Sequence, residues 1–153
     1  MDSISKAHRS WNMSRIRGKD TRPEMMVRSH LHRVGFRFRV NRADLPGKPD
    51  IVLPKYKLAI LVHGCYWHRH PSCKQCSVPK SNVPFWTKKF ERNVARDFEV
   101  KEQLGALGWR TFVIWECEAS KPEVLAKRLQ IALQLPQMKK PTGQGSKGSI
   151  MNR

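Results

Sequence analysis

The strongest constraint on the fold of this chain is a short run of sulfur and imidazole ligands, HGCYWHRHPSC. Within it, Cys65, His70 and Cys73 span nine residues, and Cys117 follows a later apolar segment that can place it alongside. Three cysteines and one histidine form a closed tetrahedral zinc site, a structural type that leaves no position for water. These four residues are therefore the expected metal ligands, and Cys76 can replace Cys73 in the set. The alternative is a group of unligated thiols beside a surface histidine.

The charge of the chain indicates a polyanionic partner. Lysine and arginine number 30 against 12 aspartates and glutamates, a formal charge of +18 over 153 residues. Each additional lysine or arginine strengthens binding to a polyanion by neutralising a phosphate and releasing counterions, so nucleic acid is the expected partner. Charge alone leaves open a ribosome-like or merely soluble basic protein.

The length and the 39% of hydrophobic residues suit one domain with one core. No apolar run approaches the roughly 18 to 20 residues that span a bilayer. The first residues also lack the apolar stretch of a signal peptide. We therefore expect a protein of the reducing cytoplasm, in which the cysteines bind metal or remain free thiols.

Three segments are expected along the chain. Residues 1–20 form a basic arm without a clear helical period, residues 21–135 the folded domain, and residues 136–153 a disordered basic tail. Met13 and Ile16 are apolar side chains set among arginines and lysines of the arm. Such residues suggest insertion into a base stack.

Capping signals and periodicity predict the elements of the folded domain. Thr21, followed three residues later by Glu24, is typical of a helix start, and that helix should run to about Val34 and stop at Gly35. Glu24 can therefore be explained as the capping partner of Thr21, and this structural role is an alternative to a catalytic role. The other expected elements are strands at 36–40, 51–53, 58–62 and 110–115, and helices at 84–107 and 122–135.

This order of elements predicts an α/β domain with a mixed central sheet flanked by helices. Reactive groups in such sheets sit at strand ends and in adjoining loops. Asp50 opens one expected strand, and the histidine cluster closes the next. The two should therefore lie close together.

Asp50, His63 and His68 form the candidate catalytic group. A carboxylate that binds Mg²⁺ beside imidazoles that activate water and protonate a leaving oxygen suits phosphodiester hydrolysis. Each residue alone has an ordinary explanation, as a turn aspartate or a packed histidine. Tyr66 and Trp67 lie between the expected zinc ligands and His68, where they can act as wedges in a base stack or pack in the core.

Four separated motifs together resemble the very-short-patch repair endonucleases, the Vsr family. They are LPGKPDIV, HGCYWHRHPSC, FWTKKFERNVARD and GWRTFVIWEC, in the family's order over residues 7 to 130 or so. The resemblance implies a restriction-endonuclease-like fold with a structural zinc ion. It also implies Mg²⁺-dependent hydrolysis of the phosphodiester 5′ of the thymine in a T:G mismatch, the product of 5-methylcytosine deamination.

The resemblance assigns the catalytic roles. Asp50 and the main-chain carbonyl of Val62 match the family's Mg²⁺ ligands. His68 matches its general base, and His63 a partner near the water or the leaving group. Glu24 matches an acidic residue near the site, so its capping and catalytic roles both remain open.

The same resemblance assigns the structural metal and the DNA contacts. The matching zinc ligands are Cys65, His70, Cys73 and Cys117, although the Pro71-Ser72 loop and the extra Cys76 depart from the family pattern. The residues that match its DNA contacts are Tyr66 and Trp67 from the major groove, Met13 and Ile16 from the minor groove, and Lys89 and Asn93 at the mispaired bases.

The implied partner is double-stranded DNA with a T:G mismatch, and the mismatch repair factor MutL is a candidate second partner. A monomer of the bacterial cytoplasm, associated with the nucleoid, is expected. Two alternatives are a related nuclease with a different DNA substrate and a non-catalytic, zinc-stabilised mismatch-binding protein. The trio Asp50, His63 and His68 argues against the second, since a pure binder does not need it.

Overall fold

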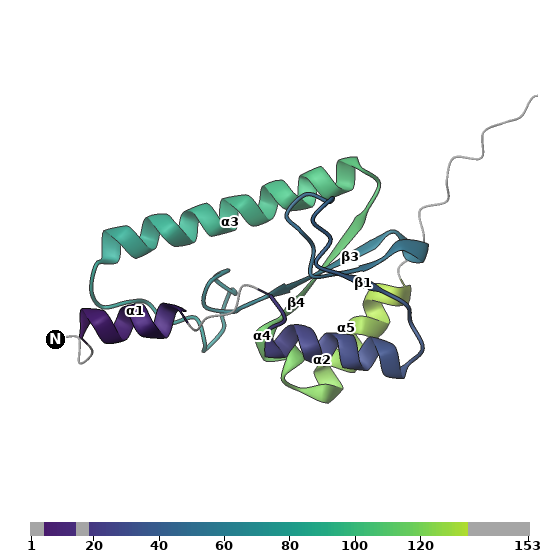
Figure 1. Ribbon diagram of the computed structural model, residues 1–153, viewed down its shortest axis with the longest axis horizontal. Helices are drawn as coiled ribbons and strands as arrows, with labels where there is room; N and C mark the ends of the chain where they lie inside the picture. Colours follow the sequence, from purple (N-terminus) through teal and green to yellow (C-terminus); the bar gives the residue numbers. More distant parts are fainter. Residues whose placement is uncertain (1–4, 15–18, 135–153) are drawn as a thin grey trace, which may run out of the picture.

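A computed structural model describes the protein over residues 5–14 and 19–134, with side chains for residues 5–11 and 19–134. The described chain forms a four-stranded sheet with helices on both faces (Figure 1). Within these residues, no helix has the length and apolar character that crossing a membrane requires. The expected mixed α/β architecture is confirmed.

The sheet has the order β1-β2-β3-β4. β1 (Arg39–Val40) and β2 (Ile51–Leu53) are antiparallel, β2 and β3 (Leu58–His63) are antiparallel, and β3 and β4 (Arg110–Trp115) are parallel. A 3-10 turn, η1 (Pro54–Tyr56), joins β2 to β3, so the strands predicted at 51–53 and 58–62 form a hairpin. The amino end of β2 and the carboxyl end of β3 therefore lie together at one edge, where Asp50 and the histidine cluster were expected to meet.

The predicted strand at 36–40 is wrong in length, because only Arg39 and Val40 pair with β2. Gly35 has a φ of +87°, and the Phe36 N–H donates to the Leu31 carbonyl at 2.9 Å, so the chain is still closing the preceding helix there. Phe36 and Phe38 then pack against the core without pairing to the sheet. The apolar residues alternate with arginines at 36–40 because the two rings are buried, and the same pattern would also arise in a strand.

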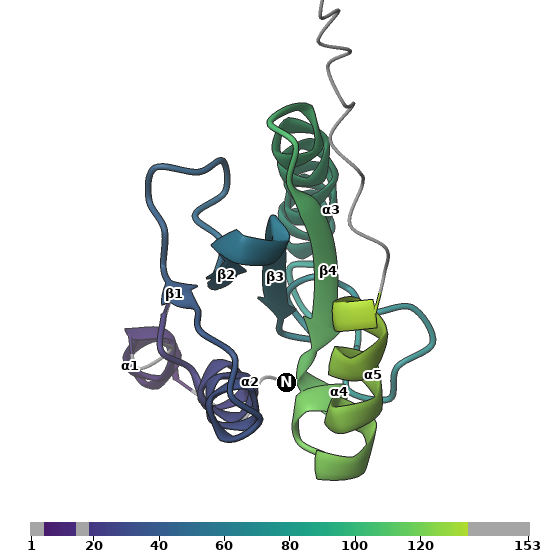
Figure 2. The same cartoon turned by 90° about the vertical axis from the view of Figure 1, so that its right-hand side faces the viewer.

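Two helices and a short third one cover one face of the sheet, and a long helix covers the other (Figure 2). The first group comprises α2 (Arg22–Arg33), α4 (Glu116–Ala119) and α5 (Pro122–Gln134), and the long helix is α3 (Val83–Ala106). The predicted ends of α2, α3 and α5 agree with these bounds to within a residue or two. The four-residue α4 was not predicted.

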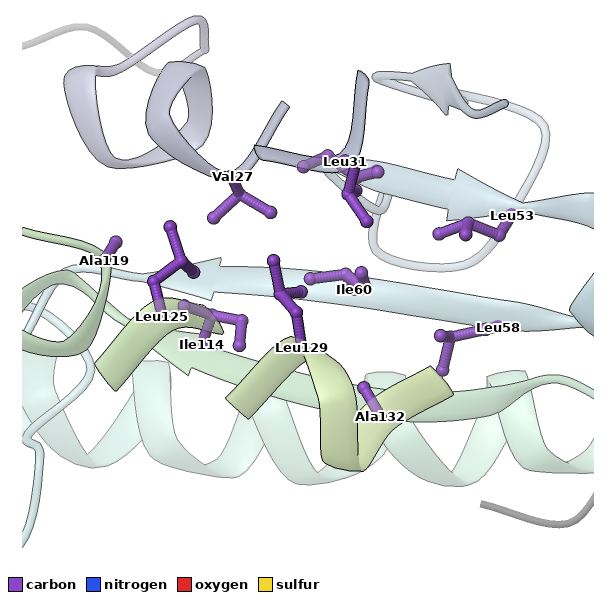
Figure 3. Close-up of a cluster of buried hydrophobic side chains, with 11 residues drawn as sticks. Val27, Leu31, Leu53, Leu58, Ile60, Ile114, Ala119, Leu125, Leu129 and Ala132 are labelled. Carbon is purple, nitrogen blue, oxygen red and sulfur yellow. The ribbon is translucent and has the colours of Figure 1, made fainter. Parts of the chain in front are cut away.

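Alternation along the strands divides the core between these faces. The larger cluster joins side chains of α2 and α5 to alternate residues of the strands (Figure 3), among them Val27, Leu31, Ile60, Ile114 and Leu129. The smaller cluster lies under α3 and contains Val52, Ala59, Leu104 and Trp109. Both clusters consist of buried residues, so the two helical layers are held by separate apolar contacts.

The segment expected to form a basic arm contains a helix, α1 (Lys6–Ser14), which was not predicted because the sequence shows no clear helical period there. The hydroxyl of Ser5 accepts from the His8 N–H at 3.2 Å, and the His8 and Trp11 rings meet edge to face at 5.7 Å. Trp11 itself is exposed. The helix is therefore supported by local contacts, which a search for a buried apolar stripe does not detect.

Candidate active site and metal centre

A carboxylate lies where the amino end of β2 meets the carboxyl end of β3. Asp50 directly precedes β2, and its Oδ2 accepts from the Val62 N–H at 2.8 Å. The pKa of Asp50 is raised to about 6, chiefly because burial desolvates the carboxylate and also because of the nearby charge of Glu24, while the Val62 amide and His68 act in the opposite direction. A carboxylate held partly ionised in this setting is a favourable ligand for a hard cation such as Mg²⁺.

Two imidazoles stack beside this carboxylate. The rings of His63, at the end of β3, and His68 are nearly parallel, with centroids 4.0 Å apart. Burial lowers the pKa of His63 to about 4, and the neighbouring His68 lowers it too. His63 is therefore neutral at neutral pH.

Asp97 of α3 completes this group; it is the last residue of the motif FWTKKFERNVARD, but no role was predicted for it. One carboxylate oxygen lies 2.7 Å from His68 Nδ1, and the other lies 3.9 Å from His63 Nε2. Lys89, Asn93 and Asp97 follow one another at intervals of four residues and therefore share one face of α3. That spacing is the signal from which Asp97 could have been predicted.

Glu24 is almost fully buried at the first turn of α2. Its N–H donates to the Thr21 hydroxyl at 3.4 Å, and its carboxylate accepts from the Asp20 N–H at 2.9 Å. Arg28 lies 3.3 Å from the same carboxylate. The capping role predicted for Glu24 is confirmed, with Asp20 in place of Thr21 as the backbone donor.

These groups line a single cavity of about 610 Å³. Lys48, Arg22 and Arg96 also line it, so its acidic centre has a basic rim. The basic side chains at the rim can bind the phosphates of a nucleic-acid backbone. The carboxylates and imidazoles at the centre can act on a single phosphodiester. The predicted site residues among the lining are Glu24, Asp50, Val62, His63, Trp67, His68 and Asn93.

A second cluster lies beyond the carboxyl ends of β3 and β4. The parallel register pairs His63 with Trp115, so Cys65 and Cys117 each lie two residues beyond the ends of neighbouring strands, at the same end of the sheet. His70 Nδ1 lies 3.7 Å from the Cys65 sulfur and 3.5 Å from the Cys117 sulfur. These separations match the edges of a tetrahedron about a metal with bonds of about 2.0 to 2.3 Å.

Cys73 supplies the third sulfur of this cluster. The ligand atoms of Cys65, His70, Cys73 and Cys117 all lie within 4.8 Å of one another, in a group that Cys76 does not join. Burial raises the pKa of the Cys65 thiol to about 12. Thiolates are disfavoured there without a cation, so this donor set suits a metal such as zinc.

Trp115 connects the two clusters, and its role was not predicted. Its ring stacks on His70 with centroids 4.2 Å apart, and it meets the His63 ring edge on at 5.3 Å. The structure thus places an unbroken row of rings between the candidate metal ligands and the candidate catalytic histidines.

The aromatic pair Tyr66 and Trp67 projects between these clusters and α3. Tyr66 meets the Phe90 ring edge to face at 5.2 Å. The Lys89 ammonium lies 5.2 Å from the Trp67 ring centre, and the Asn93 amide donates to the Trp67 carbonyl at 3.0 Å. Four residues expected to contact DNA are therefore brought together.

The remaining expected DNA contacts are not placed. Ile16 lies outside the described residues, and Met13 belongs to α1 without a described side chain. The expected basic tail, residues 136–153, also lies outside the described residues.

Comparison with known proteins gives consistent matches. A family model described as DNA mismatch endonuclease Vsr matches residues 1–75. The chain is 47% identical over 129 residues to the type II nicking enzyme V.XorIIP of Xanthomonas oryzae, an alignment that covers 84% of this chain and 94% of that protein. It is 41% identical over 134 residues to the DNA mismatch endonuclease Vsr of Escherichia coli, covering 84% of this chain and 85% of the relative. The type II nicking enzyme V.NmeAIP of Neisseria meningitidis is 41% identical over 128 residues, covering 84% of this chain and 91% of the relative.

Proposed function

Because the chain belongs to the Vsr family of DNA mismatch endonucleases, we propose that it cuts one strand of duplex DNA at a T:G mismatch. The bond hydrolysed is the phosphodiester 5′ of the thymine, and the mismatch is the product of 5-methylcytosine deamination. The observation that carries this proposal is the cavity in which Asp50, His63 and His68 meet under a basic rim. The α/β core is, on this proposal, a restriction-endonuclease-like fold.

His68 acts as the general base. Its Nδ1 faces the Asp97 carboxylate at 2.7 Å, so Nε2 is the nitrogen that remains to take a proton from the attacking water. His63 is neutral at neutral pH and can hydrogen-bond to the water or to the leaving oxygen. The two histidines proposed to take up and donate protons during hydrolysis therefore line the same cavity.

Asp50 and the main-chain carbonyl of Val62 would hold Mg²⁺. Both are oxygen ligands, which Mg²⁺ prefers, and so small a protein set leaves room for its waters and for phosphate oxygens. When bound, the ion supplies positive charge to the phosphoryl group in the transition state. Glu24, buried beside Asp50, adds acidic charge to the same cavity.

Recognition of the mismatch depends on the aromatic pair. Tyr66 and Trp67 enter beside the T:G pair, and Lys89 and Asn93 contact the mispaired bases. A mismatched step costs less to unstack than a paired one, so insertion is cheapest at the lesion. Residues 1–20, with Met13 and Ile16, form the arm that grips the minor groove, and residues 21–135 form the endonuclease domain.

Cys65, His70, Cys73 and Cys117 would hold zinc, which would fix the loop that carries the aromatic pair. The enzyme works as a monomer in the bacterial cytoplasm, on nucleoid DNA. MutL is the proposed protein partner.

Nicking of a labelled duplex tests the function. The substrate carries one T:G mismatch in a CTAGG/CCTGG context, and the control duplex is fully paired. We expect a cut in the thymine strand that requires both the mismatch and Mg²⁺. A cut of equal rate in the paired duplex would instead identify a nuclease with another substrate.

Two variants test the site within the same assay. Asp50→Ala removes the cation ligand, and His68→Ala removes the base, so each should slow nicking by at least about a hundredfold. Neither should abolish binding to the mismatch in a gel-shift measurement. Wild-type nicking rates in both variants would contradict the site, and tight mismatch binding by a wild-type protein that never cuts would identify a binding protein.

A further inference from the structure

Arg69 lies in the loop of residues 64–82 that follows β3, between the proposed base His68 and the candidate metal ligand His70. Its φ is +53°, in the left-handed region of the backbone that residues other than glycine seldom adopt. Its side chain is partly buried. No role was predicted for it, so its contacts must show what it does.

One guanidinium nitrogen of Arg69 joins two parts of this loop. Nη1 donates to the Tyr66 carbonyl at 3.3 Å and to the Ser77 carbonyl at 3.0 Å. The first carbonyl belongs to the aromatic pair, and the second lies beyond the metal ligand Cys73. Hydrogen bonds from a charged donor are roughly twice as strong as those between neutral groups. Arg69 therefore fastens the backbone of the aromatic pair to the end of the metal-binding segment.

The same guanidinium contacts rings of both the loop and α3. Its central carbon lies 4.2 Å from the centre of the Phe90 ring and 5.5 Å from the centre of the Tyr66 ring, both within the range of cation–π attraction. The two rings also meet edge to face at 5.2 Å. Because Phe90 is buried in α3, it is a fixed surface against which Arg69 restrains Tyr66.

Arg69 also lines an apolar cavity of about 520 Å³ beside α3. Trp86, Phe90 and Val94 belong to its other walls. Apolar surface of this kind favours the burial of an aromatic ring that can reach it. Without the guanidinium, this cavity offers the Tyr66 ring a second packing position, so the ring would no longer be held in one place.

The neighbouring His68 has supports of its own. Its Nδ1 lies 2.7 Å from a carboxylate oxygen of Asp97, and its ring stacks on His63 with centroids 4.0 Å apart. Loss of the Arg69 side chain should therefore free Tyr66 more than it frees His68.

We propose that Arg69 is a positioning residue that holds Tyr66 ready for insertion beside the mismatch, and that discrimination between mismatched and paired DNA depends on it. A ring that is already held in place loses less conformational freedom on insertion than a mobile ring does. The insertion rests on the proposed function. The restraint of Tyr66 does not, because it is a property of the free protein.

Fluorine NMR of the free, full-length chain tests the restraint. The chain contains two tyrosines, so 3-fluorotyrosine labels Tyr66 together with Tyr56, which packs against the larger core cluster and serves as the internal reference. Arg69→Asn removes the guanidinium, and asparagine tolerates the left-handed backbone. In this variant the Tyr66 resonance should shift or broaden while the Tyr56 resonance stays unchanged. An unchanged Tyr66 resonance would overturn the proposal without any reference to DNA.

Binding to labelled duplexes in Mg²⁺-free buffer tests the discrimination, with 2-aminopurine beside the T:G pair as a probe of unstacking. Arg69→Asn should raise the Kd for the mismatched duplex about tenfold and reduce the 2-aminopurine signal, as expected when one ring no longer inserts well. Lys74→Gln is the matched control, since it removes an exposed positive charge from the same loop. The Kd for the paired duplex should change equally in both variants. Arg69→Lys keeps a charged donor without the planar group and should recover part of the discrimination.

Three results would reject the proposal. Equal rises of Kd for mismatched and paired duplexes would make Arg69 a non-specific phosphate contact. Loss of bound metal from Arg69→Asn would assign its effect to the metal site. Unchanged discrimination with a single-turnover nicking rate at least about tenfold lower would assign its effect to His68.

The wild type separates this proposal from the proposed function. Equal binding of T:G and paired duplexes by the wild type would reject the proposed function, while the fluorine spectra would still decide whether Arg69 restrains Tyr66.

Discussion

At the scale of residues, the carboxyl group of Asp50 shows how the site opposes stability. Desolvation raises its pKa to about 6, well above the ordinary value of 3.8. The folded state therefore binds more protons than the unfolded state between about pH 4 and 6, and the wild type loses stability as pH rises through that window. The proposed cation site therefore requires an ionised Asp50 at a buried position where a neutral side chain would be more stable.

Replacing Asp50 by Asn should increase the free energy of unfolding at pH 7.5 by about 1 to 3 kcal/mol, because it removes a carboxyl group whose pKa burial raises to about 6. The gain should disappear near pH 4 and below, where aspartate is protonated in both states. Urea denaturation in metal-free buffer measures it. Asp44→Asn is the control, since Asp44 is exposed and its hydrogen bond with Arg42 lowers its pKa, and it should give no gain. A less stable Asp50→Asn protein at pH 7.5 would contradict the account.

At the scale of elements, the metal cluster ties the loop after β3 to the ends of two paired strands, β3 and β4. Cys65 follows β3, Cys117 lies in α4 after β4, and the intervening loop supplies the other two ligands. Loop closure by a metal limits the freedom of a long segment. The loop should therefore loosen, together with the aromatic pair, when the metal is removed.

Cys73→Ser and Cys76→Ser are a matched pair that tests this cluster. The first removes a ligand and should lower the bound metal well below one equivalent and Tm by about 5 °C or more. The second removes a thiol outside the cluster and should change neither quantity. Metal analysis after dialysis and thermal denaturation give both results. Metal loss in the Cys76 variant alone would reverse the assignment.

Elements were predictable from the sequence where local and tertiary signals agree. The capping residues of α2 and the two apolar runs of the hairpin gave correct bounds, because burial and turn chemistry favour the same structure there. The α1 helix was missed because it has local contacts and no buried stripe. No role was predicted for Asp97, because the four-residue spacing places it on the face of Lys89 and Asn93 but its partner His68 lies on another element.

At the scale of the whole molecule, the layers place the site at one end of the sheet. The N-terminal half of α3 extends beyond the strands in Figure 1, above the ends of β3 and β4 that carry the clusters. The hairpin turn η1 lies at the opposite end of the same strands. The net charge of +18 attracts DNA from a distance, and the cavity that holds the candidate catalytic residues lies at the end of the sheet where β3 ends.

Binding to duplex DNA should weaken steeply with salt. The association constant should fall by about a thousandfold between about 50 and 200 mM salt if six phosphates are contacted. Lys48→Gln, at the rim of the cavity, should reduce the slope of log K against log salt by about one. Lys55→Gln, an exposed lysine in η1, should leave the slope unchanged. Fluorescence anisotropy titrations measure both, and equal slopes for the two variants would place the DNA elsewhere.

The eleven residues from His63 to Cys73 hold two candidate catalytic histidines, the aromatic pair and three metal ligands, whereas Asp97 lies on a separate helix. The loop is therefore not a portable module. Grafted alone onto another sheet, it would lack Cys117, the fourth ligand of its metal, and would leave the imidazole of His68 free to protonate on either nitrogen. An engineer who wants its chemistry must transplant the face of α3 with it.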